Sequence, residues 1–128
     1  MKIAEYVGNN IVTIELHDRL TVETAQGFLT AIAKRLNGGW PGIILDLQHV
    51  EYMDSAGLGA LICAYTMCEK HGTRLVFVRV SGKNLELLTI TKLLTVFEVY
   101  ETTLEAERSL RASGRYAAPA TERAVCTA

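Results

Sequence analysis

The stretch YMDSAGLG at residues 52–59 holds the residue types most capable of chemistry in this chain: an acid, a serine and two glycines ahead of an apolar-patterned run. A serine beside an acid suggests three roles: a nucleophile, the cap of a helix, or part of a surface that another molecule recognises. A nucleophile needs a nearby base and a strained turn, whereas a cap needs only the start of a helix. The residues around Ser55 separate these roles.

The sequence argues against Ser55 as a nucleophile. The nucleophile elbow of esterases reads GxSxG, and position 53 is Met rather than Gly. His17, His49 and His71 have ordinary surface or helix-end explanations, and no acid and histidine pair has a recognisable order. A phosphate-binding loop of the form GxxxxGK[ST] is also missing. We therefore predict that the protein is not an enzyme and needs neither a cofactor nor a metal.

Ser55 and Asp54 are both suitable caps for the helix that follows. If Asp54 is the cap, Ser55 takes the first helical position and its hydroxyl faces solvent. Gly57 and Gly59 each cost a helix roughly 1 kcal/mol relative to alanine, so helix stability does not explain them. Such glycines can leave the backbone bare, so that another molecule approaches Ser55 and the amides of the first turn. We therefore favour a surface recognition site over a plain cap.

Composition points to a single domain without a general affinity for polyanions. The chain has 128 residues, 49% of them hydrophobic, and a net charge of -1. That balance argues against binding to nucleic acid or directly to a membrane surface through charge alone. The sequence shows neither a signal peptide nor an apolar run long enough to span a membrane, which predicts a cytoplasmic protein. Cys63, Cys68 and Cys126 fit neither a disulfide framework nor a zinc site, so we expect buried, reduced thiols.

The first elements are predicted from turn chemistry and periodicity. Strands at 3–7 and 11–16 are separated by Gly8-Asn9-Asn10, which is typical of a β-hairpin. A helix is predicted over 21–37, with Thr21 as its cap. Its apolar face is formed by Ala25, Phe28, Leu29, Ile32 and Leu36.

Two almost continuously apolar runs, GIILDL at 42–47 and LVFVRV at 75–80, predict strands that are buried on both faces. Between them, a helix is predicted over 55–70, directly after Asp54. Its face is expected to comprise Leu58, Leu61, Ile62, Tyr65 and Glu69. A strand, a helix and a strand at this spacing form a βαβ unit, so the two strands should be parallel neighbours.

The carboxyl-terminal part predicts three more elements. A helical stretch after Gly82 carries Leu85, Leu88, Leu93 and Leu94, FEVY at 97–100 predicts an edge strand, and TTLEAERSLR at 102–111 a last helix. The folded domain is expected to cover 1–111. The segment 112–128 is rich in alanine and poor in large apolar residues, so we expect a disordered tail.

Taken together, YMDSAGLGAL, the preceding GIILDL and the following helix and LVFVRV resemble the STAS domain of bacterial anti-sigma factor antagonists. The resemblance runs from about residue 3 to residue 110, through LLTITKLLTVFEVYETTLEA. It implies an α/β fold in which a small mixed sheet of about four to five strands is flanked by about four helices.

The resemblance also implies a role in partner switching. In the family, the serine that matches Ser55 is phosphorylated by an anti-sigma factor that is also a serine kinase, and a PP2C-type phosphatase removes the phosphate. The unphosphorylated form binds the anti-sigma factor and frees the sigma factor. The residues expected to meet the partner are Thr21, Asp54, Ser55, Ala56, Gly57 and Leu58.

Three positions, Asp18, Thr21 and Lys92, depart from the family pattern. Family members usually carry Gly-x-Leu-Asp before the first helix, whereas this chain has Asp18-Arg19-Leu20-Thr21. Lys92 also stands where a glycine is common. Because the aspartate of that signature belongs to the surface that meets the kinase, its loss favours an alternative: a STAS scaffold without a switch, or an accessory subunit, in a stress-signalling assembly or a lipid-transporting ATPase.

Overall fold

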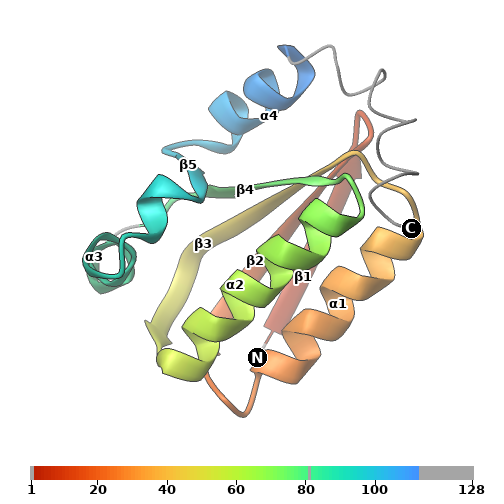
Figure 1. The fold of residues 1–128 in the computed structure, drawn as a ribbon. Helices are drawn as coiled ribbons and strands as arrows, with labels where there is room; N and C mark the ends of the chain where they lie inside the picture. The colour runs from red at the N-terminus through yellow and green to blue at the C-terminus, as the bar shows by residue number, and fades with distance from the viewer. Residues whose placement is uncertain (1, 81, 113–128) are drawn as a thin grey trace.

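The computed structural model describes residues 2–80 and 82–112, and these residues form one mixed sheet with helices on both faces (Figure 1). In chain order the elements are β1 (Lys2–Gly8), β2 (Ile11–Leu20), α1 (Ala25–Asn37), β3 (Gly42–Met53), α2 (Ser55–Lys70), β4 (Arg74–Val78), α3 (Gly82–Ile90), the 3-10 turn η1 (Leu93–Thr95), β5 (Glu98–Tyr100) and α4 (Thr103–Ala112). The predicted fold class is confirmed.

The strands lie side by side in the order in which they occur in the chain, β1-β2-β3-β4-β5. β1 and β2 are antiparallel, and the hairpin turn between them places Asn9 and Asn10 at φ 52° and 64°. A two-residue turn in which both residues have positive φ matches the right-handed twist of the two strands it joins. Asparagine adopts this left-handed backbone region more readily than most residues. The predicted hairpin is confirmed, although β2 continues beyond residue 16 to Leu20.

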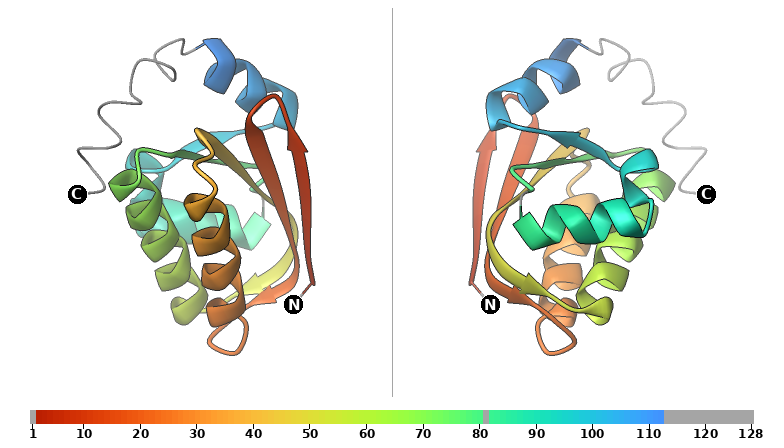
Figure 2. Two further views of the ribbon diagram at one scale, coloured as in Figure 1. Left: turned by 90° about the vertical axis from the view of Figure 1, so that its right-hand side faces the viewer. Right: turned by 90° about the vertical axis from the view of Figure 1, so that its left-hand side faces the viewer.

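The other strands are parallel: β2 to β3, β3 to β4, and β4 to β5. The register pairs Ile43 with Leu75 and Leu45 with Phe77, which confirms the predicted βαβ unit. Because each crossover advances by one strand in the same direction, α1 and α2 cover the same face of the sheet, as the two side views show (Figure 2).

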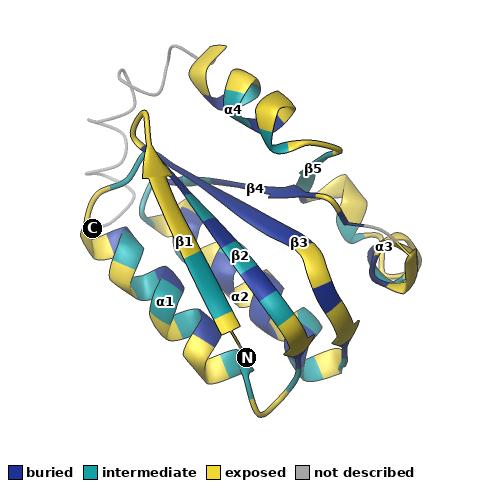
Figure 3. Cartoon of the chain, turned by 180° about the vertical axis from the view of Figure 1, so that it is seen from behind, coloured by how far each residue is buried: buried dark blue, intermediate teal, exposed yellow. Residues whose placement is uncertain are grey.

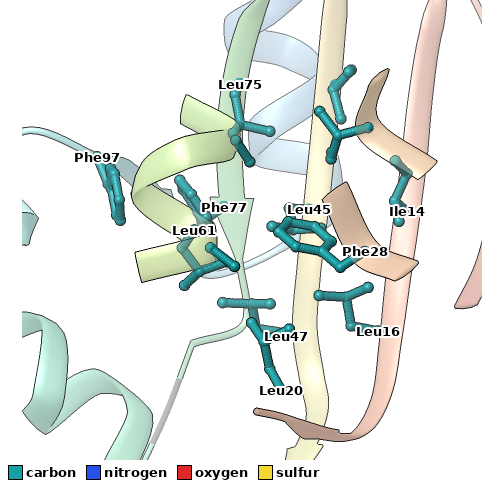
Figure 4. Packing of buried hydrophobic residues seen from close by; sticks show 14 of the residues in the cluster. Ile14, Leu16, Leu20, Phe28, Leu45, Leu47, Leu61, Leu75, Phe77 and Phe97 are labelled. Atoms are coloured by element: carbon teal, nitrogen blue, oxygen red, sulfur yellow. The ribbon is translucent and has the colours of Figure 1, made fainter. Parts of the chain in front are cut away.

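The main core lies between the sheet and the helices α1 and α2. Phe28 of α1 and Leu61 of α2 point toward the strands, and Phe77 stacks on Phe97 with ring centroids 4.5 Å apart (Figure 4). The predicted apolar face of α1 is confirmed, since Phe28, Ile32 and Leu36 are buried. Leu88 of α3 joins the same core.

A smaller core lies on the opposite face of the sheet, under α4. It comprises Ile11, Ile44, Val76, Val78, Ala106 and Leu110. α4 packs on β3, β4 and β5, so the lower part of β1, β2 and β3 stays uncovered on this face (Figure 3). The predicted edge strand and last helix are both confirmed.

Two helix predictions need correction. α1 begins at Ala25, because residues 21–24 form a turn in which the Thr21 amide donates to Thr24 Oγ1 at 2.9 Å; the Thr21 side chain caps nothing. The third helical stretch is interrupted at Lys92, whose φ of 63° ends α3 and starts η1. Residues 113–128 of the predicted tail lie outside the described residues, while Ala112 still belongs to α4.

The buried face of α2 matches the predicted one only in part. It is formed by Gly57, Ala60, Leu61, Ala64 and Cys68, whereas Ile62 is 42% exposed. Small residues at this spacing let the helix approach the sheet closely, while Leu58 and Tyr65 of the predicted face are partly buried against the core. Cys68 is buried as expected, Cys63 is exposed, and Cys126 lies outside the described ranges. Over those ranges, no helix is both long and apolar enough to cross a membrane.

Candidate functional site

The candidate site lies where β2 and β3 end and α2 begins. Because β2 and β3 are parallel, their carboxyl ends meet at one edge, and Leu20 is the register partner of Met53. The turn at 21–24 and the first turn of α2 lie at this same end of the molecule (Figure 1). Loops at the carboxyl ends of parallel strands are common binding sites in α/β folds.

Asp54 fixes the start of α2. Its carboxylate accepts the Gly57 amide at Oδ1 (2.8 Å) and the Val22 amide at Oδ2 (3.4 Å). Its own amide donates to the Leu20 carbonyl at 3.3 Å. Asp54 is therefore the N-cap of the helix, and it also ties the 21–24 turn to that helix.

Ser55 is consequently free of the capping role. It is the first residue of α2 and exposed, and no other described residue offers its hydroxyl a hydrogen bond. The amides of Ser55 and Ala56 precede the hydrogen bonds of the helix itself, and the helix dipole makes this end partly positive. The site therefore presents an accessible hydroxyl in surroundings that favour an added negative charge.

Gly57 has an internal reason to be glycine. A Cβ at this position would lie 2.0 Å from the Leu20 carbonyl oxygen and 2.7 Å from its carbon, so the helix could not approach β2. Gly57 is buried, and the interpretation that its backbone is left bare for an outside molecule is wrong. Gly59 is different, since it is exposed and a Cβ there would meet nothing within 4 Å.

The remaining predicted contact residues surround Ser55 in sequence or lie on the neighbouring turn. Ala56 and Leu58 are half-buried, and Thr21 is half-buried with its carbonyl accepting the Ala25 amide at 2.8 Å. Sequence reasoning missed Val22 and Tyr52, which are 70% and 51% exposed. Two features of the sequence could have indicated them: Val22 is an apolar residue in an otherwise polar turn, and Tyr52 is an aromatic residue two positions before the cap Asp54.

The two positions at which the family pattern leads one to expect glycine, Asp18 and Lys92, have positive φ, whereas Thr21 does not. Asp18 has φ 75° and Lys92 has φ 63°, a region that favours glycine. Asp18 lies next to an irregularity in the pairing of β2 with β3. The glycines that the resemblance leads one to expect therefore meet a conformational need, and this chain meets the same need with side chains at a modest cost in strain.

Among the described residues, no histidine is hydrogen-bonded to Ser55. His17 and His49 stack on each other on β2 and β3, with ring centroids 4.6 Å apart, and His71 caps the far end of α2. Burial raises the pKa of the Cys68 thiol to about 12, which makes it unreactive. Burial, and then the charge of Glu69, raises the pKa of Tyr65. Neither group belongs to the first turn of α2.

Comparison with known proteins places the chain in a family. The family model for the STAS domain matches residues 2–106, and the chain therefore belongs to the STAS domain family. Among solved structures, it is similar to a candidate anti-sigma factor antagonist from Thermotoga maritima, with a TM-score of 0.80 and 25% identity over 85% of this chain and 94% of that one.

Two further structures share the fold at lower identity. One is the Bacillus cell fate determinant SpoIIAA in its phosphorylated form, with a TM-score of 0.67 and 19% identity over 85% of this chain and 99% of that one. The other is a sulfate transporter family protein from Wolinella succinogenes, with a TM-score of 0.73 and 20% identity over 84% of this chain and 89% of that one. The predicted resemblance is confirmed at the level of family and fold.

Proposed function

We propose that this protein is an anti-sigma factor antagonist whose binding to its partner is switched off by phosphorylation of Ser55. The observation that carries the proposal is the separation of roles at the start of α2. Asp54 accepts the Gly57 amide at 2.8 Å and caps the helix, which leaves Ser55 exposed with its hydroxyl unengaged. A serine needed only for capping would have its oxygen on an amide of the first turn.

The proposed partner is an anti-sigma factor that is also a serine kinase, and a PP2C-type phosphatase would restore the binding form. The contact surface comprises Thr21, Val22, Tyr52, Asp54, Ser55, Ala56 and Leu58. Val22 and Tyr52 contribute exposed apolar area, while buried Gly57 sets the position of the helix start. Since the partner controls transcription, the proposal places the protein in the cytoplasm.

A phosphate on Ser55 should leave the domain folded. Phosphorylation adds about -1.5 to -2 charges at neutral pH. At the start of a helix those charges are stabilised by free amides and by the helix dipole. The hydroxyl is exposed, so the phosphate displaces no packed side chain.

The effect of the phosphate must then fall on the interface. An acidic group of the partner about 4 Å away is repelled by roughly 4 kcal/mol per charge at an effective dielectric constant near 20. A hundredfold loss of affinity needs only about 2.7 kcal/mol. One phosphate is therefore sufficient to release a partner that brings a carboxylate close to Ser55.

A capture experiment from the native organism tests this proposal. Wild-type protein, Ser55→Ala and Ser55→Asp serve as baits, and the captured proteins are identified by mass spectrometry. We expect wild type and Ser55→Ala to retain a small kinase and Ser55→Asp to lose it. Thr66→Asp is the matched control, because Thr66 is exposed on the same helix away from its first turn. Equal capture of the kinase by all four baits would contradict the switch.

A second function has specific support and is separated by the same experiment. The chain lacks the glycine and aspartate of the family signature at Asp18 and Thr21, and it shares its fold with a sulfate transporter family protein. Both features suit a scaffold or accessory subunit of a stress-signalling assembly or a transporter. In that case all baits would capture scaffold or transporter subunits regardless of the charge at position 55.

A further inference from the structure

Three side chains that coordinate metals in other proteins meet on the sheet face opposite α1 and α2. Glu15, His17 and His49 each offer one ligand atom, and these atoms all lie within 4.8 Å of one another. His17 Nε2 is 3.2 Å from Glu15 Oε1. The two imidazole rings stack with an interplanar angle of 9°. Among the described residues, this is the one group of three or more such side chains close enough to share an ion.

The alternation of the strands places the cluster on the face that α4 leaves open. Leu16 belongs to the core under α1 and α2, so its neighbours Glu15 and His17 point to the opposite face. α4 packs on β3, β4 and β5 and covers the upper part of that face (Figure 3). The cluster is therefore accessible, with Glu15 and His17 half-buried and His49 exposed.

A β-bulge brings His49 into the cluster. Glu15 is paired with Asp46 and His17 with His49, so β2 advances by two residues while β3 advances by three. In regular pairing, position 49 would lie on the opposite face of β3 from Asp46. The extra residue turns His49 to the face of His17, and bulges commonly re-aim a side chain in this way next to functional sites.

The donor set suits a divalent transition metal. Two imidazole nitrogens and one carboxylate oxygen are a ligand combination of zinc sites that keep a fourth position open. Ligand atoms around one tetrahedral zinc ion lie about 3.3 Å apart, so a small movement of side chains would close the site. His49 is exposed and can turn its ring to bring a nitrogen toward the ion.

The charges around the cluster leave these three side chains available. Asp46, opposite Glu15 in the register, is only 2% exposed and pairs with Arg79 at 3.7 Å. Its other oxygen accepts the Gln48 amide at 2.9 Å. Asp46 is thus already engaged, and Lys2, the register partner of His17 on β1, is a surface side chain free to turn away from a bound cation.

We propose that Glu15, His17 and His49 form a binding site for a divalent transition metal such as zinc, with one coordination position open to water or to a group from another molecule. Glu15 and His17 are half-buried and supply two ligand atoms that are already close together. His49 completes the set from the adjacent strand. The site lies on the other side of the sheet from the main core and does not involve Ser55.

Calorimetric titration of the full chain with zinc chloride, free of any affinity tag, tests this site. We expect the wild type to bind a single zinc ion and His49→Ala to bind zinc at least about a hundredfold more weakly. Removing a residue that only hydrogen-bonds to a metal ligand already lowers metal affinity by about 10- to 100-fold, and His49 is proposed as a ligand itself. Glu15→Gln should weaken binding in the same direction. His71→Ala is the control and should bind as wild type does, because His71 contacts the Met67 carbonyl on α2.

Cobalt substitution distinguishes this site from binding by the cysteine thiols. Cobalt held by nitrogen and oxygen ligands lacks the intense near-ultraviolet absorption of thiolate coordination. We expect a spectrum without that absorption, unchanged in a Cys63→Ser variant. No saturable zinc binding by the wild type, equal binding by His49→Ala, or a thiolate spectrum would each overturn the proposal.

Discussion

Asp54, Ser55 and Gly57 stand within one turn of α2 but meet different physical requirements. Asp54 supplies the cap, with its carboxylate accepting the Gly57 amide at 2.8 Å. Gly57 supplies clearance, because a Cβ there would overlap the Leu20 carbonyl. Ser55 alone is left with a side chain that the described fold does not use. Of these three residues, only Ser55 therefore offers a hydroxyl to a modifying enzyme.

Substitution of the two glycines of α2 should have opposite effects on stability. Gly57→Ala places a methyl group 2.0 Å from the Leu20 carbonyl oxygen, so we expect a loss of about 1–3 kcal/mol, as for overpacked sites. Gly59→Ala meets nothing within 4 Å and should stabilise the helix by up to about 1 kcal/mol. Urea unfolding followed by circular dichroism measures both. Equal effects of the two substitutions would show that Leu20 does not constrain the start of α2.

At the scale of single residues, the sequence predicted which residues lie at the start of α2, but not always the structural role of each. The pair Asp54-Ser55 already indicated that one of the two was spare, and the structure shows which one. The role of Gly57 was not predictable, because its constraint is the carbonyl of Leu20, thirty-seven positions earlier in the chain. The residue type at Asp18 did not predict its positive φ, because this backbone conformation occurs beside an irregularity in the pairing of β2 with β3.

Among the elements, the edge strand β5 depends on a polar junction with β4 and α4. Arg74 Nε donates to Glu98 Oε2 at 2.8 Å, and Arg74 Nη2 donates to Ser109 Oγ at 3.0 Å. Tyr100 is hydrogen-bonded to the same serine at 2.7 Å. The hydrogen bond from Arg74 is the main cause that lowers the pKa of Glu98. Arg74 thus adds side-chain contacts with β5 and α4 to the backbone pairing of β5 with β4.

The lowered pKa of Glu98 predicts a loss of stability in acid. A carboxyl whose pKa is lower in the folded state contributes stability above its unfolded pKa of about 4.3, and that contribution disappears as the pH falls through the lower folded value. We expect Glu98→Gln to be less stable than wild type at pH 7, by no more than about 1 kcal/mol because the pair is partly exposed, and the difference to vanish in acid.

Thermal unfolding of wild type and Glu98→Gln over a range of pH from neutral to about 3 checks this expectation. Glu101→Gln serves as the control, because Glu101 is an exposed neighbour at the end of β5. A difference between wild type and Glu98→Gln that stays constant down to the lowest pH would mean that the ion pair does not stabilise the edge strand.

The elements themselves were largely predictable, because their signals are local. The hairpin followed from Gly8-Asn9-Asn10, and the parallel pair from two apolar runs separated by a helical pattern. The ends of elements were less predictable. Thr21 is a good cap by type, but Thr24 Oγ1 closes the preceding turn by accepting the Thr21 amide and donating to the Arg19 carbonyl, and the helix starts later.

On the scale of the whole molecule, the sheet separates two surfaces with different chemistry. The turn at 21–24 and the start of α2 share one end of the fold, as the views in Figures 1 and 2 show. The Glu15, His17 and His49 cluster lies on the open face of the sheet. The family could be inferred from the DSxGLG motif and its surroundings. The cluster could not, because it depends on a β-bulge in β3.

A phosphate on Ser55 would lie on the surface of the domain. Ser55 is exposed, and the core under α1 and α2 contains no part of its side chain. We therefore expect phosphorylation to change the electrostatic potential at one end of the fold and to leave the arrangement of helices and strands as it is.

The most direct test measures the affinity of the captured kinase for two forms of the protein, unphosphorylated and carrying phosphoserine incorporated at position 55. Circular dichroism and thermal unfolding of both forms check that the fold is the same. We expect the phosphorylated form to bind at least about a hundredfold more weakly while remaining folded, which corresponds to about 2.7 kcal/mol. Equal affinity of the two forms, or a loss of binding that accompanies unfolding, would contradict a switch that acts through charge at Ser55.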